Sequence, residues 1–193
     1  MNPYRKRVWS ILEPILRACA PLKSVLDFGS GDGWFASQVL AQKLTGYLVA
    51  LDVKRRDAVF VEPTIYLPGS PLPFADRTFD LVYSVDVLHH CDDPFAQLDE
   101  LIRVSRRYLL IKDHNHFGPV GRLTLAVLDE LGNRRFGIPS PYRYQHAWNW
   151  NTHLAQRGWI QKKLIHPARC HTGPMGALTN GLQYIALYER EGD

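Results

Sequence analysis

The feature that most constrains the fold of this chain is a short apolar run that leads directly into a glycine-rich loop. The run covers residues 24–28 and carries Asp27 near its end, and three alternating glycines follow it within residues 29–33. Glycines spaced in this way allow a tight turn and let the backbone approach a bound molecule closely. Helical spacing of apolar residues then begins at residue 34. The order strand, tight loop, helix predicts an α/β fold with a ligand-binding loop near its start.

Strand-like and helix-like segments continue to alternate along the chain. Buried strands are predicted over residues 24–28, 47–53, 79–84 and 108–112, and residues 59–66 have room for one more strand. Helices are predicted over residues 4–20, 34–43 and 93–105, the last with Asp93 as its N-cap. This order indicates a Rossmann-like, doubly wound α/β fold with a mostly parallel sheet. Two final strands, at residues 159–166 and 182–189, are expected to add an antiparallel C-terminal strand or hairpin.

One domain accounts for the whole chain, residues 1–193, of which 46% are hydrophobic. Residues 115–150 interrupt the alternation with an amphipathic helix at about 120–131 and a loop rich in proline and tyrosine at 139–145. We expect this insertion to lie over one edge of the sheet as a lid. Its aromatic run either packs a planar or lipid-like molecule or belongs to the ordinary core, and consists of Tyr142, Tyr144, Trp148 and Trp150.

Charge and cysteine content exclude several classes of protein. The net charge is +4, from 23 basic and 19 acidic side chains, without the run of like charges that marks a nucleic-acid-binding tail. The three cysteines lie far apart and have no CxxC spacing, which predicts no disulfide framework and favours a reducing, cytoplasmic location. No apolar window approaches the length of a membrane span, and charged residues interrupt the N-terminal apolar stretch before it reaches the length of a signal peptide.

The residues at the two strand tips indicate what the loop binds. The loop departs from the dinucleotide pattern GxGxxG, because Gly33 falls one position early. Asp27 would repel a pyrophosphate but would pair with an ammonium group, and the backbone donors at the next helix start suit a carboxylate. Asp52, at the end of the second strand, can accept both hydroxyls of a ribose, and Val53 can cover one face of an adenine. An amino acid joined to a nucleoside meets these requirements.

Three motifs in this order resemble the class I S-adenosylmethionine-dependent methyltransferases, and within them the methyltransferase type 11 group. The motifs are VLDFGSGDG at 25–33, LVALDV at 48–53 and LPFADRTFDLVYSVDVLHHCDDP at 72–94. The resemblance covers roughly residues 22–112 and implies an enzyme whose cofactor is S-adenosyl-L-methionine. It further implies that Asp27 lies near the amino group of the cofactor, that the glycine loop surrounds its methionine part and that Asp52 binds its ribose.

One position departs from the family pattern. Pro68 stands where related sequences carry an acidic residue for the adenine amino group, so a backbone carbonyl near Gly69 or the Ser70 hydroxyl is expected to replace it. The predicted cofactor-binding residues are Asp27, Gly29, Ser30, Gly31, Gly33, Asp52, Val53, Gly69, Ser70, Ser84 and Val85.

Two histidines are the predicted catalytic residues. Ser84, Val85 and Asp86 follow a strand at the carboxyl edge of the sheet, where we expect the transferable methyl group. His89 comes shortly after them, and His114 follows the next strand to the same edge. An imidazole with a pKa near 6.5 can remove a proton from an acceptor or orient it.

Each of these assignments has a structural alternative. His89 or its neighbour His90 can satisfy local backbone groups, and for His90 this alternative is favoured. Asp113 either orients His114 as a base or forms a loop-stabilising ion pair with Lys112. No metal ion is expected, because His89, Asp113 and His114 lack a further spaced carboxylate or cysteine.

The sequence as a whole therefore predicts a cytoplasmic methyltransferase that moves a methyl group to a small-molecule acceptor by in-line displacement. The short insertion favours a compact acceptor, and a nucleic-acid partner is disfavoured. No NPPY or DPPY tetrapeptide follows residue 84, which argues against methylation of amino groups on DNA bases. The alternatives are an RNA or protein methyltransferase and a non-catalytic protein that binds S-adenosylmethionine.

Overall fold

Short apolar segments form the central sheet of this chain, and helices fill the connections between them. The computed structural model describes residues 2–133 and 141–192. Its strands are β1 (Leu22–Phe28), β2 (Thr45–Asp52), β3 (Thr64–Ile65), β4 (Phe79–Val85), β5 (Ser105–His116), β6 (Gln145–His146), β7 (Trp159–Ile165) and β8 (Gln183–Arg190). Its α-helices are α1 (Pro3–Ala18), α2 (Trp34–Ala41), α3 (Pro94–Val104), α4 (Pro119–Asn133), α5 (Asn149–Ala155) and α6 (Gly173–Thr179). Two short 3₁₀ turns are η1 (Leu88–His90) and η3 (Asn180–Leu182).

The sheet is Rossmann-like, with strand order β3-β2-β1-β4-β5-β8-β7 and β6 paired to the end of β5. The first five strands in this order are parallel, whereas β8 runs antiparallel to both β5 and β7. The mostly parallel sheet and the antiparallel C-terminal strand are therefore confirmed. The two final strands form a pair, and β8 is the one inserted beside β5.

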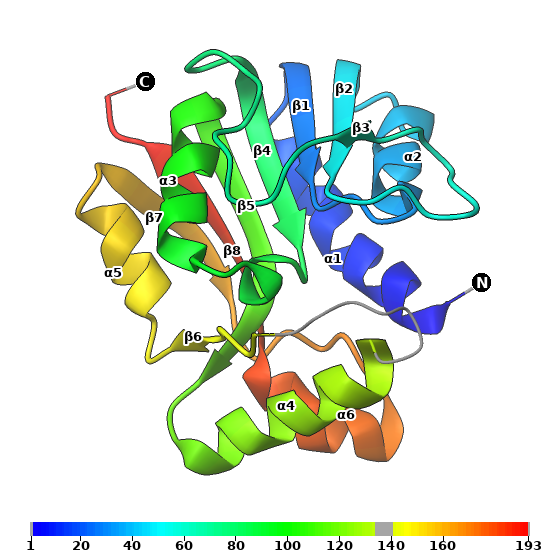
Figure 1. The fold of residues 1–193 in the computed structure, drawn as a ribbon, viewed down its shortest axis with the longest axis vertical. Coiled ribbons are helices and arrows are strands. Elements are labelled where there is room, and N and C mark those ends of the chain that lie inside the picture. Colours follow the sequence, from blue (N-terminus) through cyan, green and yellow to red (C-terminus); the bar gives the residue numbers. More distant parts are fainter. Residues whose placement is uncertain (1, 134–140, 193) are drawn as a thin grey trace.

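Helices cover both faces of the sheet and enclose two cores. On one face α1 and α2 pack against the strands, with Val8, Leu12 and Val39 buried. On the other face α3 and α5 do the same, with Leu98 and Trp150 buried. Figure 1 shows α3 and α5 on the near side of the sheet, and α4 and α6 near the end at which the parallel strands finish.

Sequence expectations for several elements need correction. β5 continues to His116, four residues beyond the predicted end, so that the polar residues 113–116 belong to the strand itself. Both α6 and the two-residue β6 were not predicted. The amphipathic helix of the insertion is present as α4. Residues 139–140 of the predicted proline-rich and tyrosine-rich loop lie outside the described residues.

The N-cap of α3 follows its sequence signal. The Asp93 carboxylate accepts hydrogen bonds from Phe95 N at 3.0 Å and Ala96 N at 3.1 Å, and Pro94 occupies the first helical position. This cap sets the start of the helix that follows η1. Cys19, Cys91 and Cys170 are all free thiols. No helix within the described ranges is long and apolar enough to cross a membrane.

Candidate active site

The carboxyl ends of four parallel strands bring the predicted site residues to one edge of the sheet. β1 ends beside β2 on one side and β4 on the other, with Phe28 opposite Leu51 and Ser84. β4 in turn places Val85 opposite Lys112 of β5. Ligands of open α/β sheets bind at this edge, because the loops that leave the strands diverge there.

The glycine loop is held against the end of β2 by its own backbone. Gly29 N and Ser30 N both donate to Leu51 O, at 2.8 and 3.0 Å, and Gly31 N donates to Asp52 Oδ2 at 2.7 Å. Gly31 has a φ of +61°, and a Cβ added there would meet no atom within 4 Å. Left-handed backbone beside open space leaves room for a ligand against the loop.

Asp27 is a buried carboxylate with unused hydrogen-bonding capacity. Its side chain is 2% exposed, and Oδ2 has no hydrogen-bond partner among the described residues. Burial raises the pKa of Asp27 to about 7, with a further rise from the charge of Asp52 and an opposing effect of the neighbouring Tyr83 hydroxyl. Ser30 Oγ and Ser84 Oγ are also buried and unpartnered within the described part of the chain. Buried polar atoms of this kind need a partner, and a cationic ligand group would supply one to Asp27.

Asp52, the predicted ribose ligand, lies at the end of β2 beside the glycine loop. Its two oxygens accept from Gly31 N and Lys54 N, at 2.7 and 3.1 Å, and a carboxylate retains further lone pairs for hydroxyl donors. Apolar side chains are exposed in the same region, namely Val53 and Phe60, and Ile65 beside Asp52 in the β2–β3 pairing. Exposed apolar groups around this carboxylate would suit the faces of a purine.

The segment expected to hold the adenine amino group forms a turn. Gly69 has a φ of +77°, and Ser70 N donates to Leu67 O at 3.1 Å. No hydrogen bond between described residues joins Gly69 or Ser70 to the glycine loop or to Asp52. Their contact with adenine therefore stays a prediction.

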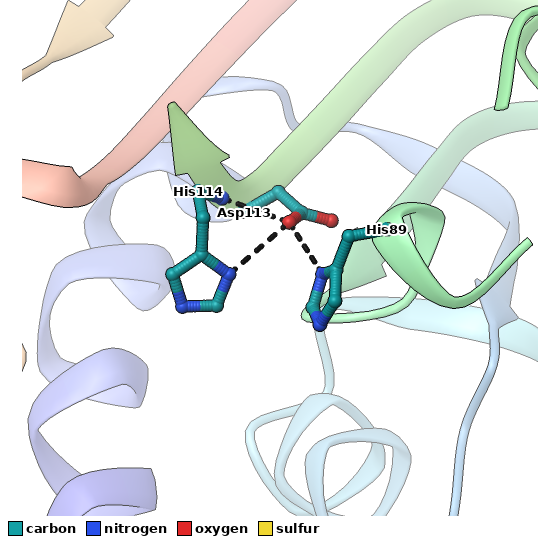
Figure 2. Close-up of side chains that lie close together, drawn as sticks. All are labelled: His89, Asp113 and His114. Atoms are coloured by element: carbon teal, nitrogen blue, oxygen red, sulfur yellow. Dashed lines mark hydrogen bonds and ion pairs between the residues drawn. The ribbon is translucent and has the colours of Figure 1, made fainter. Parts of the chain in front are cut away.

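The two predicted catalytic histidines share one carboxylate. Figure 2 shows His89 and His114 on either side of Asp113, with both rings directed toward it. His89 Nδ1 lies 2.6 Å from Asp113 Oδ1, and His114 Nδ1 lies 3.3 Å from the same oxygen. Asp113 is completely buried and also accepts from Leu88 N at 3.1 Å and His114 N at 2.8 Å. The carboxylate thus fixes the end of β5 against η1 and holds the ring of His89, whereas His114 Nδ1 lies at ion-pair distance from it and has no hydrogen-bond partner among the described residues.

His89 and His114 have opposite electrostatic environments. Burial opposes a charge on His89, but the charge and hydrogen bond of Asp113, together with Asp129, raise the pKa of His89 to about 10. Burial, and then the nearby charge of Lys112, lower the pKa of His114 below its usual value. The pKa of Asp113 falls well below its usual range because its interactions with the two histidines outweigh its burial. At neutral pH the structure therefore pairs a charged His89 with a neutral His114.

Exposure separates the two histidines further. The His89 side chain is 1% exposed and has a carboxylate near each ring nitrogen, since Nε2 lies 3.5 Å from Asp129 Oδ1. The His114 side chain is 13% exposed. His114 is open enough to accept a proton from a bound molecule. His89 is buried, and each of its ring nitrogens faces a carboxylate. For His90, burial and then the charge of His89 lower the pKa to about 4.

Lys112 forms a buried polar network that the sequence did not predict. It does not pair with Asp113: its ammonium group contacts Asp86, the Tyr4 hydroxyl and Gln183 Oε1. The Tyr4 hydroxyl also donates to Asp86 Oδ2 at 2.5 Å. Asp86 is held there with a φ of +57°. The network joins the start of α1 to the ends of β4 and β5, beside the position at which the methyl group was expected.

The aromatic run of the insertion divides between core and site. Trp150 is 1% exposed in the core beneath α5, which is the ordinary structural role. Tyr144 lies with its ring centroid 5.4 Å from that of His89, and its hydroxyl donates to Asp129 Oδ2 at 2.7 Å. The sequence identified Tyr144 but missed Asp129. A lone acidic residue on an amphipathic helix gives no local signal of such a contact.

Comparisons with known proteins find methyltransferases. A family model described as a methyltransferase domain matches residues 26–108. A tRNA U34 carboxymethyltransferase of Hahella chejuensis is 29% identical over 170 residues, which cover 80% of this chain and 48% of the relative. A demethylmenaquinone methyltransferase of Renibacterium salmoninarum is 28% identical over 176 residues, which cover 80% of this chain and 71% of the relative. The chain spans about half the length of several curated relatives that it matches.

Solved structures share the fold. An S-adenosylmethionine-dependent methyltransferase of Mesorhizobium loti aligns with a TM-score of 0.62 at 17% identity, over 92% of this chain and 96% of the other. At 17% identity, this alignment shows that the two proteins share a fold.

Proposed function

Because the chain belongs to the class I S-adenosylmethionine-dependent methyltransferases, we propose that it transfers a methyl group from S-adenosylmethionine to a small molecule with an ionisable hydroxyl or carbon acid. One observation carries this proposal. The carboxylate of Asp27, with one oxygen unpartnered among the described residues, the carboxylate of Asp52 and the neutral imidazole of His114 all lie at the carboxyl edge of the sheet.

The residues present fit the cofactor of this family. Asp27 would take the ammonium group, the open space at Gly31 would take the methionine chain, and Asp52 would take the ribose hydroxyls. Val53, Phe60 and Ile65 supply exposed apolar surface for the adenine.

The main task of the protein is to hold the acceptor close to the methyl group. Bound S-adenosylmethionine would supply an electrophilic methyl group on its sulfonium: a lone pair of the acceptor attacks the methyl carbon in line as the carbon–sulfur bond breaks, and the neutral thioether S-adenosylhomocysteine leaves. Correct placement alone accounts for a large part of the rate of such a reaction. A hydroxyl or a carbon acid must also lose a proton, and a neutral imidazole can receive it.

His114 is the residue we assign to this proton. Its ring is neutral and partly exposed, and Asp113 lies near Nδ1, so that Nε2 is the nitrogen left for an acceptor. We assign His89 no direct contact with the acceptor, since both of its ring nitrogens face carboxylates. Its role is to hold η1 and Asp113 in place.

The short insertion at residues 115–150 favours a compact acceptor, because it leaves little of the chain to recognise a macromolecule. The quinone precursor in the name of one relative is also a small molecule.

Transfer from methyl-labelled S-adenosylmethionine into fractionated cell extract tests the proposal. We expect label in the small-metabolite fraction. His114→Ala should lower the rate by at least about a hundredfold while the affinity for S-adenosylmethionine, measured by calorimetry, changes by less than about twofold. His153→Ala is the matched control, because His153 pairs with Asp99 on the α3–α5 side of the sheet and should leave the rate unchanged.

Two outcomes would contradict the proposal. Cofactor binding without methyl transfer to any fraction would indicate a non-catalytic binding protein. Equal rates for His114→Ala and wild type would show that His114 is not the general base.

RNA is the second candidate acceptor, because one relative is named for a tRNA position. Label that ribonuclease releases, with an acceptor Michaelis constant that rises steeply with salt, would establish this alternative. A constant that is independent of salt favours the small molecule.

A further inference from the structure

Three side chains from the η1 turn and the insertion converge in a way that neither the cofactor nor the proton transfer explains. Single ligand atoms of His89, His90 and Asp129 all lie within 4.8 Å of one another. His89 and His90 belong to η1, whereas Asp129 belongs to α4. We propose that these three residues bind a divalent transition-metal ion, which would replace the proton on His89 Nε2 and release it to solvent.

The separations favour this set over the other histidine group at the same place. Two ligands of one tetrahedral ion with bonds near 2.0–2.1 Å lie about 3.3 Å apart. His89 Nε2 and Asp129 Oδ1 are separated by 3.5 Å, which matches. His89 Nδ1 and Asp113 Oδ1 are separated by 2.6 Å, which is a hydrogen bond and too short for two ligands of one ion. Asp113 would therefore accept a hydrogen bond from the metal-binding His89 and would not bind the ion itself.

The surrounding contacts orient two of the three ligands. Histidines that bind metals commonly donate their second ring nitrogen to a carboxylate, and Asp113 accepts from His89 Nδ1 in this way. Tyr144 donates to Asp129 Oδ2 at 2.7 Å, and Asp129 Oδ1 lies 3.5 Å from His89 Nε2. His90 Nδ1 is buried and has no hydrogen-bond partner among the described residues, so an ion would supply one.

The donor types select the class of ion. Two imidazoles and one carboxylate suit zinc, iron or another first-row divalent ion, and they leave positions open for water or a ligand oxygen. Magnesium and calcium prefer sites made of oxygen alone. The sequence predicted no metal because a further carboxylate was lacking. Asp129 of α4 supplies a carboxylate beside the histidines. An ion here would tie the insertion to η1, and this consequence does not depend on methyl transfer.

Calorimetric titration of the untagged, chelator-treated protein with zinc chloride tests the site, with magnesium chloride as the comparison. We expect one equivalent of zinc to bind and magnesium to give no heat. Asp129→Asn should weaken zinc binding more than tenfold, since loss of even an outer partner typically costs 10- to 100-fold. Glu130→Gln is the matched control on the same helix, because the Glu130 carboxylate meets Tyr142 instead.

Tyr144→Phe provides a second variant that keeps the ring in place. It should weaken zinc binding roughly tenfold by releasing Asp129 Oδ2. Zinc should also raise the melting temperature of wild type and Glu130→Gln but not of Asp129→Asn. The proposal is overturned if wild type binds no zinc, or if Asp129→Asn and Glu130→Gln bind it equally well.

Discussion

Asp27 is a buried acid at the carboxyl edge of the sheet, and among the described residues one of its oxygens has no hydrogen-bond partner. Its raised pKa, about 7, means that the protein without cofactor carries the neutral acid below that pH. An ammonium group binds the ionised form, so cofactor binding must remove the proton at low pH. Affinity for S-adenosylmethionine should therefore increase as pH rises through 7.

We predict that the dissociation constant for S-adenosylmethionine falls on the order of tenfold between pH 6 and pH 7.5, because the ionised fraction of a group with a pKa near 7 changes by about this factor. Calorimetry across this range measures the effect, and above about pH 8 the amino group of the ligand itself loses its proton. Asp27→Asn should bind more weakly at pH 7.5 and show a flat profile. A wild-type profile as flat as that of the variant would exclude contact between Asp27 and the ammonium group.

Tyr83→Phe offers a finer test of the same residue. The Tyr83 hydroxyl opposes the rise in the pKa of Asp27, so its removal should move the midpoint of the profile to higher pH. Tyr83 is buried beside β1, and phenylalanine preserves the shape of its ring. A midpoint that stays in place would mean that another group controls the titration.

At the scale of an element, the loop between β1 and α2 has two glycines with similar backbone and different surroundings. Gly31 and Gly33 have φ values of +61° and +73°. A Cβ at Gly31 would enter open space, but one at Gly33 would lie 2.7 Å from Val61 O and 2.8 Å from Val61 N.

We predict that Gly31→Ala costs about 1–2 kcal/mol of unfolding free energy from left-handed strain alone, while it strongly weakens cofactor binding by filling the open space. Gly33→Ala should cost more than about 2 kcal/mol, because the Val61 backbone must also move. Urea denaturation gives both values. Equal losses of stability would show that the packing of residue 61 on the loop has no energetic consequence.

The cap of α3 makes a second prediction at this scale. Asp93→Ala removes the acceptor for Phe95 N and Ala96 N and should lower the unfolding free energy by about 1 kcal/mol. Asp92→Ala, one residue earlier, is the control and should change stability by less than about 0.5 kcal/mol. If both variants lose the same unfolding free energy, the charge of this segment, and not the N-cap hydrogen bonds of Asp93, would account for the loss.

Elements with a local pattern could be predicted from sequence, and the contacts between distant elements could not. The strands at residues 79–85 and the helix after Asp93 each carry their own apolar spacing or capping signal. β5 was predicted to end at Lys112 because Asp113 and Asn115 beyond it are polar, although both are buried. Their burial depends on partners contributed by η1 and by Trp148, which no single window of sequence contains.

The same reason explains which parts of the candidate site were foreseen. Asp27, Asp52 and the glycines lie in contiguous motifs, so that their arrangement follows from strand, loop and helix order. Asp129 and His89 are 40 positions apart in the sequence. They come together only when α4 folds over η1. Tyr4 and Lys112 meet across 108 positions.

At the scale of the whole molecule, the Lys112 network joins four distant elements in one polar cluster. Lys112 is completely buried and contacts Tyr4 from α1, Asp86 after β4 and Gln183 from β8. A buried charge is tolerated only while its partners remain, so removal of one member should cost far more than removal of an exposed ion pair.

A double-mutant cycle measures this dependence. Asp86→Asn leaves the buried Lys112 ammonium without its counter-charge and should cost about 3 kcal/mol or more of unfolding free energy. Lys112→Met in the same background removes that uncompensated charge, so the double variant should be more stable than Asp86→Asn alone. The two single losses should then exceed the loss of the double variant by about 1–3 kcal/mol. Strict additivity in urea denaturation would mean that Lys112 and Asp86 act independently and that α1 is held to the sheet by its apolar face alone.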